Sequence, residues 1–270
     1  MNFAQRLKET QAATKSLLCV GLDVDPAKLP DHFRSNPNGV VEFSKRIIES
    51  TADLVCAYKP NLAFFEALGT HGHETLKEIL EFIPKHILTI GDAKRGDIGT
   101  TAERYAASLF DVFGFDAVTV NPYLGLDSVE PFLRKEEKGV FLLALTSNAG
   151  SKDFQRLKVG TKPLYERVVE KAKKWNTKKN LGLVVGATHP RELKSLRKLA
   201  PEMPFLIPGV GAQGGDLESS VKFGCVDPGW GAVITTSRSV LYASSGKNFA
   251  EEARKEALNM KGSIDTRRTS

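Results

Sequence analysis

The sequence predicts one α/β domain, a single (β/α)8 TIM barrel with an extra N-terminal helix. The 270 residues contain eight short apolar runs, and helix-compatible segments separate successive runs. No Ser/Gly-rich linker or change in composition divides the chain. Apolar strands that alternate with helices are typical of a parallel sheet covered by helices. Eight such units suit a chain of this length when the sheet closes into a barrel.

The expected strands are short runs rich in β-branched and aliphatic residues. In chain order they cover residues 17–22, 54–59, 87–91, 117–120, 140–145, 182–185, 205–207 and 232–235. The expected helices between and after them cover residues 40–51, 62–82, 98–113, 126–135, 162–175, 190–199, 215–223 and 250–259.

The two ends of the chain complete the expected organisation. Met1 to Leu7 have helical spacing without the long apolar core of a secretory signal, so we expect a helix that covers the barrel. The domain is expected to span residues 1–261. Residues 262–270 are polar and basic, which predicts a disordered tail.

Composition narrows the partners that this chain could have. Apolar stretches are strand-sized, whereas a membrane helix needs about 20 residues, so no membrane partner is expected. The net charge is +6, and its positive excess is spread over residues 152–179 and the tail at Arg267 and Arg268, without a recognisable nucleic-acid-binding module. This pattern argues against nucleic acid and favours mild attraction for a small anionic substrate.

The cysteines and histidines predict no disulfide and no metal centre. Cys19, Cys56 and Cys225 are odd in number and widely spaced, so we expect free thiols in a reducing, cytoplasmic compartment. His71 and His73 resemble a metal-binding pair, but no third ligand lies at a useful spacing.

A charged corner at residues 91–101 joins the third expected strand to the next helix. Asp92 and Lys94 are two residues apart, so both project from the same face if the strand continues that far. Asp97 occupies the position of a helix N-cap or of an acid in the first turn.

Polar residues follow most of the other expected strands as well. Because active sites of (β/α)8 barrels lie at the carboxyl ends of the strands, these residues are expected to meet at one rim. They are Asp23, Lys59, the corner at 91–101, Asn121 to Tyr123, Thr146 to Asn148, Pro208 to Gly215 and Thr236 to Arg238.

The loops after the seventh and eighth strands predict a phosphate site. Glycines between 209 and 215 expose backbone N–H groups, and Gln213 and Arg238 add side-chain donors. A Gly-rich connector with a surface Arg is the structural alternative. Residues 209–214 also match the dinucleotide pattern GxGxxG, but that pattern belongs in an opening βαβ unit, so no dinucleotide cofactor is expected.

Lys59, Asp92, Lys94 and Asp97 form a candidate catalytic set of alternating charges. Adjacent carboxylates favour protonated lysines. A protonated Lys94 could act as a general acid or as a fixed positive charge beside a developing carbanion. A purely structural ion-pair network is the alternative.

The pattern Asp92-x-Lys94-x-x-Asp97-Ile98-x-x-Thr101, with Asp23, Lys59, the glycines at 209–215 and Arg238, resembles the orotidine 5′-phosphate decarboxylase family. The resemblance extends from about Leu17 to Leu241. Gly99 stands where many members have Pro, and together with the chain length this resembles the family's longer-chain branch.

The resemblance implies a homodimeric enzyme without metal or cofactor. It would convert orotidine 5′-monophosphate to UMP and CO2, the last step of de novo pyrimidine biosynthesis. In the implied assignment, Lys94 protonates C6 and Asp92 lies near the departing carboxylate, while Asp97 reaches the partner's site. The implied substrate contacts are Asp23, Lys59 and Thr101 to the ribose, Ser147 to the base, and Gln213 and Arg238 to the phosphate.

Two other functions remain open at this point. A magnesium-dependent sugar-phosphate decarboxylase of the same barrel superfamily shares an Asp-x-Lys-x-x-Asp signature, and its acids hold the metal. A nucleotide-binding regulator on an inactive barrel would bind the ligand without turnover.

Overall fold

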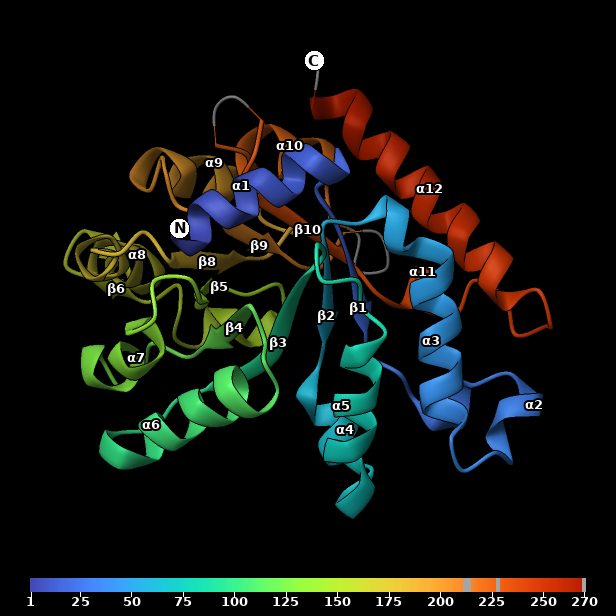
Figure 1. Cartoon of the computed structure of the whole chain (residues 1–270). Coiled ribbons are helices and arrows are strands. Elements are labelled where there is room, and N and C mark those ends of the chain that lie inside the picture. The colour runs from blue at the N-terminus through green and yellow to red at the C-terminus, as the bar shows by residue number, and fades with distance from the viewer. Residues whose placement is uncertain (211–214, 227–228, 269–270) are drawn as a thin grey trace.

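The chain forms a closed parallel barrel surrounded by helices in a computed structural model (Figure 1). The structure describes residues 1–210, 215–226 and 229–268. The strand order around the barrel is β1-β10-β9-β8-β5-β4-β3-β2, and β1 pairs in parallel with both β2 and β10. The expected (β/α)8 fold is confirmed.

The barrel strands coincide with the eight expected runs. They are β1 (Leu18–Leu22), β2 (Ala57–Pro60), β3 (Leu88–Arg95), β4 (Ala117–Val120), β5 (Gly139–Leu145), β8 (Leu181–Val185), β9 (Phe205–Ile207) and β10 (Ala232–Thr236). The largest difference is in β3, which continues four residues past the expected end at Gly91. An unexpected antiparallel pair, β6 (Lys158–Val159) and β7 (Lys162–Pro163), lies between β5 and the following helix.

Most helices that cover the barrel lie close to the expected segments, whereas the short helices at residues 31–34 and 238–241 were not expected. They are α1 (Phe3–Thr14), α2 (Asp31–Arg34), α3 (Gly39–Thr51), α4 (Leu62–Glu66), α5 (Gly72–Glu81), α6 (Gly99–Ala107), α7 (Leu126–Leu133), α8 (Leu164–Trp175), α9 (Pro190–Leu199), α10 (Leu217–Gly224), α11 (Arg238–Leu241) and α12 (Phe249–Arg268). The single helix expected at 62–82 is divided, because the chain turns at Gly69, whose φ is +71°. Helix α6 ends in one π-helical turn, Ser108–Val112.

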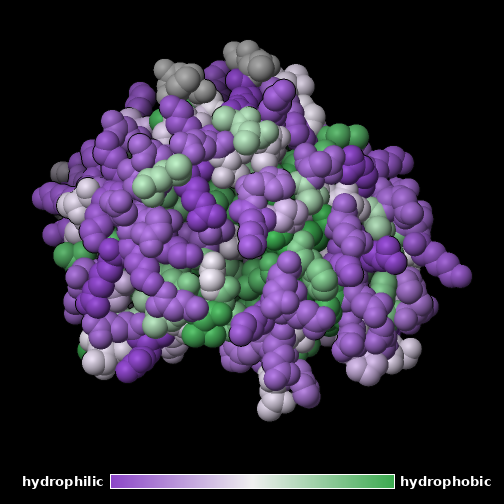
Figure 2. All heavy atoms as spheres, in the orientation of Figure 1, coloured by the Kyte–Doolittle hydropathy of each residue, from purple (hydrophilic) through white to green (hydrophobic). Residues whose placement is uncertain are grey.

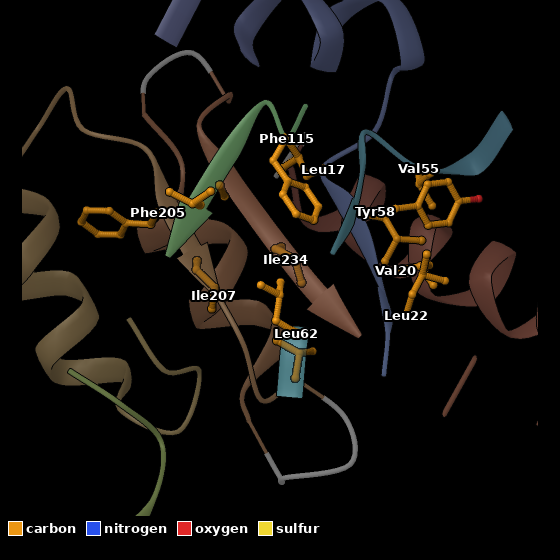
Figure 3. Close-up of a cluster of buried hydrophobic side chains, with 14 of the residues drawn as sticks. Leu17, Val20, Leu22, Val55, Tyr58, Leu62, Phe115, Phe205, Ile207 and Ile234 are labelled. Carbon is orange, nitrogen blue, oxygen red and sulfur yellow. The ribbon is translucent and has the colours of Figure 1, made fainter. Parts of the chain in front are cut away.

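Strand side chains alternate between two buried regions. Val20 and Leu22 of β1 and Tyr58 of β2 face the surrounding helices, and Figure 3 shows them in one cluster. The side chains between them in sequence point into the barrel, because side chains alternate with period two along a strand. Figure 2 shows one face of the molecule, which is largely hydrophilic, with hydrophobic residues gathered near its middle.

The extra N-terminal helix closes one end of the barrel, as expected. Phe3 and Leu7 of α1 are buried in one cluster with Ala57, Ala117 and Phe141 from the strand interiors. The Phe3 ring meets the Phe141 ring edge-on at a centroid distance of 5.9 Å. Helix α1 therefore forms an apolar floor and leaves the carboxyl ends of the strands as the open end.

The expectation of a disordered tail from Gly262 is wrong for residues 262–268. Helix α12 continues to Arg268, and the Ile264 side chain is buried in the core with Ala253 and Ala257. The spacing of these three residues keeps them on one face of a helix. Burial of Ile264 therefore fixes a segment whose polar composition suggested disorder.

Two further findings concern composition. The three cysteines are free thiols, as expected, with Cys19 and Cys56 buried. Among the residues that the structure describes, no helix is both long and apolar enough to cross a membrane.

Candidate active site

The barrel interior changes from apolar to polar toward the carboxyl ends of the strands. Cys19, Ala57, Ile90, Ala117 and Val233 belong to the cluster above the α1 floor. Two positions further along each strand the inward residues are Gly21, Lys59, Asp92, Thr119 and Thr235. Because inward-facing side chains recur every second residue along a strand, the next inward-facing residues form a polar layer above the apolar floor.

A compact set of charges occupies this layer. The Asp92 carboxylate accepts hydrogen bonds from Lys59 Nζ at 2.9 Å and from Lys94 Nζ at 2.6 Å, one on each oxygen. Lys59 Nζ also lies 3.8 Å from Asp23 Oδ1. Lys59 is only 4% exposed, so its ammonium group depends on these two carboxylates in place of water.

The pKa values follow from this packing. Burial opposes the charged form of Lys59, but the attraction of Asp92 and Asp23 outweighs it and raises the pKa of Lys59 above its ordinary value. Burial also opposes the charged form of Asp92. The two lysines dominate there and hold the pKa of Asp92 well below its usual range. Lys59 is therefore an ammonium and Asp92 a carboxylate at neutral pH.

Lys94 reaches this set through an irregular strand. The pairing of β3 with β4 shifts between Gly91, opposite Val118, and Arg95, opposite Val120. Within this bulge Lys94 has φ +49°, a left-handed conformation that non-glycine residues rarely adopt. The predicted meeting of Asp92 and Lys94 is thus present, although a bulge rather than a regular strand produces it.

Thr119 is a site residue that the sequence reasoning missed. Its hydroxyl accepts a hydrogen bond from the Lys94 backbone N–H and donates one to Asp92 Oδ1, both at 2.9 Å. The signal was available, because Thr119 is two residues after the inward-facing Ala117 on β4 and is the single polar residue of that run.

A cavity of about 400 Å³ extends from this set toward Arg238. Its lining residues include the predicted Asp23, Lys59, Asp92, Gly209 and Arg238, and also Asp25, Lys28, Thr235 and Tyr242. The predicted Gln213 lies outside the described residues.

Close packing of β1 against the start of α11 shapes this end of the cavity. A Cβ atom at Gly21 would lie 1.9 Å from Ser237 Oγ, so only glycine fits there without displacing Ser237, the residue before Arg238. Tyr242 joins the segments that follow these two elements. Its Oη accepts from the Asp25 N–H at 2.8 Å and donates to the Asp23 carbonyl at 3.3 Å.

A second cavity of about 370 Å³ also adjoins the charged set. Lys59, Asp92 and Pro208 line both cavities, and Lys94, Thr119 and Ser147 line only the second. The predicted Ser147 therefore lines the second cavity, whereas Arg238 lines the first. His189 and Gln155 anchor the neighbouring Thr146 through its carbonyl, N–H and hydroxyl groups.

Within one chain, Asp97 and Thr101 lie away from the charged set of Lys59, Asp92 and Lys94. The Asp97 carboxylate accepts from the N–H of Ile98 at 2.8 Å and forms no ion pair with any described residue. The expected capping role is wrong, because Ile98 is the N-cap of α6 and Asp97 precedes it. Thr101 is exposed on α6. Neither residue lines either cavity.

The described residues contain no group of three or more His, Cys, Asp or Glu side chains placed to hold a metal ion. The potential ligands Asp23 and Asp92 both face Lys59 instead.

The fold and this site define a class of protein. A TIM barrel with a buried Lys-Asp-Lys set at its carboxyl end, between one cavity lined by Arg238 and another lined by Ser147, is an enzyme of the barrel class suited to an anionic substrate.

Comparison with known proteins identifies the family. The sequence model described as the orotidine 5′-phosphate decarboxylase / HUMPS family matches residues 16–255. Curated orotidine 5′-phosphate decarboxylases from Dehalococcoides mccartyi and Herpetosiphon aurantiacus are 52% and 49% identical, covering 98% and 94% of this chain and 98% and 95% of their own. The Leishmania donovani OMP decarboxylase structure superposes with a TM-score of 0.88 at 41% identity, covering all of both chains. The chain belongs to the orotidine 5′-phosphate decarboxylase family, an assignment that makes it a decarboxylase and supports a place in pyrimidine biosynthesis.

Proposed function

We propose that this chain converts orotidine 5′-monophosphate to UMP and CO2 without a metal or cofactor, as the last step of de novo UMP synthesis. The observation that carries the proposal is the Lys59–Asp92–Lys94 set, in which Lys59 and Asp92 line both cavities and Lys94 lines the second. A nucleotide could place its phosphate in the first cavity and its base in the second.

The lining of the first cavity supports an orientation for the nucleotide. The Arg238 guanidinium suits a phosphate dianion, and the predicted contact from Gln213 would add to it. Asp23 Oδ1 is buried and lacks a hydrogen-bond partner among the described residues, so it is a ready acceptor for a ribose hydroxyl. With Lys59 also at the ribose, the base extends toward Ser147 and Lys94.

The chemistry of this orientation requires a proton donor at C6 of the base. When the bond from C6 to the carboxylate breaks, the electron pair remains on C6. The Lys94 ammonium stabilises that pair and then donates a proton to C6, and Lys94 later recovers a proton from solvent. Asp92 holds Lys94 Nζ through a 2.6 Å hydrogen bond, so the donor is oriented before the substrate arrives.

We assign the larger catalytic effect to Lys94 rather than to repulsion by Asp92. Asp92 would lie near the departing carboxylate and repel it. However, Asp92 is already neutralised by two lysines, which weakens any repulsion that it exerts. Binding energy from the phosphate, remote from C6, can hold the base against the charged set.

We also propose a homodimer in which Asp97 and Thr101 serve the partner's site. Their absence from both cavities of their own chain supports this arrangement. So does the apolar surface beside them, since Ile98, Tyr123, Leu124 and Leu126 are 57%, 80%, 48% and 44% exposed. The free thiols favour a cytoplasmic enzyme.

Subunit mixing tests the shared site. Heterodimers of Lys94→Ala and Asp97→Ala chains contain one site with both residues intact, so two inactive variants should regain activity when mixed. Verified heterodimers without any recovery would contradict the shared site.

An assay of chelator-treated protein tests the function itself. We expect the treated chain to consume orotidine 5′-monophosphate, followed as loss of its ultraviolet absorbance, at the rate of untreated chain. Loss of turnover that magnesium restores would instead support the metal-dependent alternative. Tight binding of the nucleotide without turnover would support the regulator.

A further inference from the structure

We infer that Thr119 is a positioning residue that holds Lys94 in its left-handed backbone conformation and orients the Asp92 carboxylate toward it. The inference rests on the proposed function, because it concerns how the proton donor is placed. It assigns a role to a residue of β4 that lines the second cavity but has no predicted contact with the substrate.

The first observation is the environment of the Thr119 hydroxyl. Thr119 is 1% exposed, so its hydroxyl group finds its hydrogen-bond partners within the protein rather than in water. The Lys94 N–H can only donate, and the Asp92 carboxylate can only accept. The single hydroxyl proton is therefore directed to Asp92, and the hydroxyl oxygen receives the Lys94 N–H.

The second observation is the bulge in β3. Four steps along β3, from Gly91 to Arg95, are matched by only two along β4, from Val118 to Val120. Ladder pairing resumes at Arg95, whose carbonyl accepts from the Asn121 N–H at 2.8 Å. Between these points the Lys94 N–H bonds to a side chain rather than to a β4 carbonyl. Thr119 thus replaces the ladder contact that the bulge removes.

The third observation is that Thr119 acts on both ends of the Lys94–Asp92 contact. Asp92 Oδ1 accepts from Lys94 Nζ and from Thr119, while Oδ2 accepts from Lys59. Rotation of the carboxylate would break the bond to Thr119. A change of φ at Lys94 from +49° would break the other bond of the same hydroxyl. One hydroxyl therefore restrains the backbone of the proton donor and the anion that orients its ammonium.

If Thr119 served strand packing alone, its hydroxyl group would not be needed for activity. Three variants separate a packing role from a positioning role. Thr119→Val keeps the shape and removes the hydroxyl. Thr119→Ser keeps the hydroxyl and removes the methyl group. Thr89→Val is a matched control, because Thr89 is on the adjacent strand β3 and its hydroxyl bonds to an aspartate, Asp116, near the α1 floor.

The test measures kcat and KM for orotidine 5′-monophosphate and the Kd for UMP. Misplacing the donor should lower kcat of Thr119→Val by about 10- to 100-fold, with KM and the UMP Kd within about threefold of wild type. Thr119→Ser and Thr89→Val should retain kcat within about threefold. Retained kcat in Thr119→Val, or equal losses in the Val and Ser variants, would overturn the inference.

Two further experiments test the same role if Thr119→Val does not fold or if the wild-type chain shows no turnover. If Thr119→Val does not fold, Thr119→Ser against Thr119→Ala repeats the comparison with smaller side chains and the same two outcomes. If the wild-type chain shows no turnover, the proposed function fails. The positioning role is then decided by a crystal structure of the hydroxyl-free variant. Lys94 should leave the left-handed region there, and an unchanged Lys94 would overturn the inference.

Discussion

Replacing Asp92 with Asn should destabilise the folded chain, because Asp92 neutralises two lysines. Lys59 is buried, and its nearest other carboxylate oxygen, on Asp23, is 3.8 Å away against 2.9 Å for Asp92. Removing one partner of a buried ion pair costs about 3–5 kcal/mol. Asp23 remains near Lys59 and Lys94 is half-exposed, which places the expected loss at the lower end, about 3 kcal/mol.

The same loss of folding free energy should lower the melting temperature, and its size should depend on pH. For a chain of 270 residues, 3 kcal/mol corresponds to a fall in Tm of about 5 °C. The folded pKa of Asp92 is lowered, so its contribution is complete above its unfolded pKa of about 4 and is lost as pH falls. The folded pKa of Lys59 is raised, so its contribution is complete below about 10.4 and is lost as pH rises.

Urea unfolding of wild type and Asp92→Asn between pH 3 and pH 11 measures both effects. The stability gap should be widest near neutral pH and narrower at both extremes. Asp53→Asn is the matched control, because its ion pair with Arg254 is 60% and 45% exposed and should contribute less than about 1 kcal/mol. An Asp92→Asn variant as stable as wild type, or a gap independent of pH, would refute this account of the charged set.

Three further predictions concern other parts of the chain. Arg238→Ala should weaken UMP binding by at least about tenfold, measured by calorimetry, because a charge-assisted contact to phosphate is lost; unchanged affinity would place the phosphate elsewhere. Phe3→Ala should lower the free energy of unfolding by about 3–5 kcal/mol while kcat per folded molecule stays unchanged, since it opens the barrel floor. A loss of kcat would connect the floor to the site. Gly262→Ala should raise the free energy of unfolding by about 0.5–1 kcal/mol, because Gly262 is exposed in α12 with open space around it, whereas a disordered tail would show no change.

Much of the fold was predictable because buried strands are apolar and regular. The run 117–120 and the run 205–207 became β4 and β9 without change. The extension of β3 was not predictable from its composition, since Asp92 to Arg95 are mostly charged and resemble a turn. They remain part of the strand, with a bulge at Lys94, because Arg95 pairs with Val120 and Lys94 bonds to Thr119, which are contacts between segments distant in sequence.

The site was predictable where the residue type itself indicates a chemical role, as a charged side chain does. Lys59, Asp92 and Lys94 carry charges at strand ends and meet as expected. Thr119 was missed because a threonine inside an apolar run is also a common strand residue, so its type alone indicates no role. Tyr242 was missed because only the fold brings its hydroxyl to Asp23 and Asp25. The position of Asp97 before α6 depended on the backbone at Ile98, which the sequence does not specify.

The most direct test of the central claim is the turnover of orotidine 5′-monophosphate by Lys94→Ala, measured beside its affinity for UMP. The account predicts that turnover is abolished while UMP binds nearly as well as to wild type, because Lys94 supplies the proton and Arg238, in the other cavity, holds the phosphate. Near-normal turnover by Lys94→Ala would contradict the account, since the proton would then come from another group.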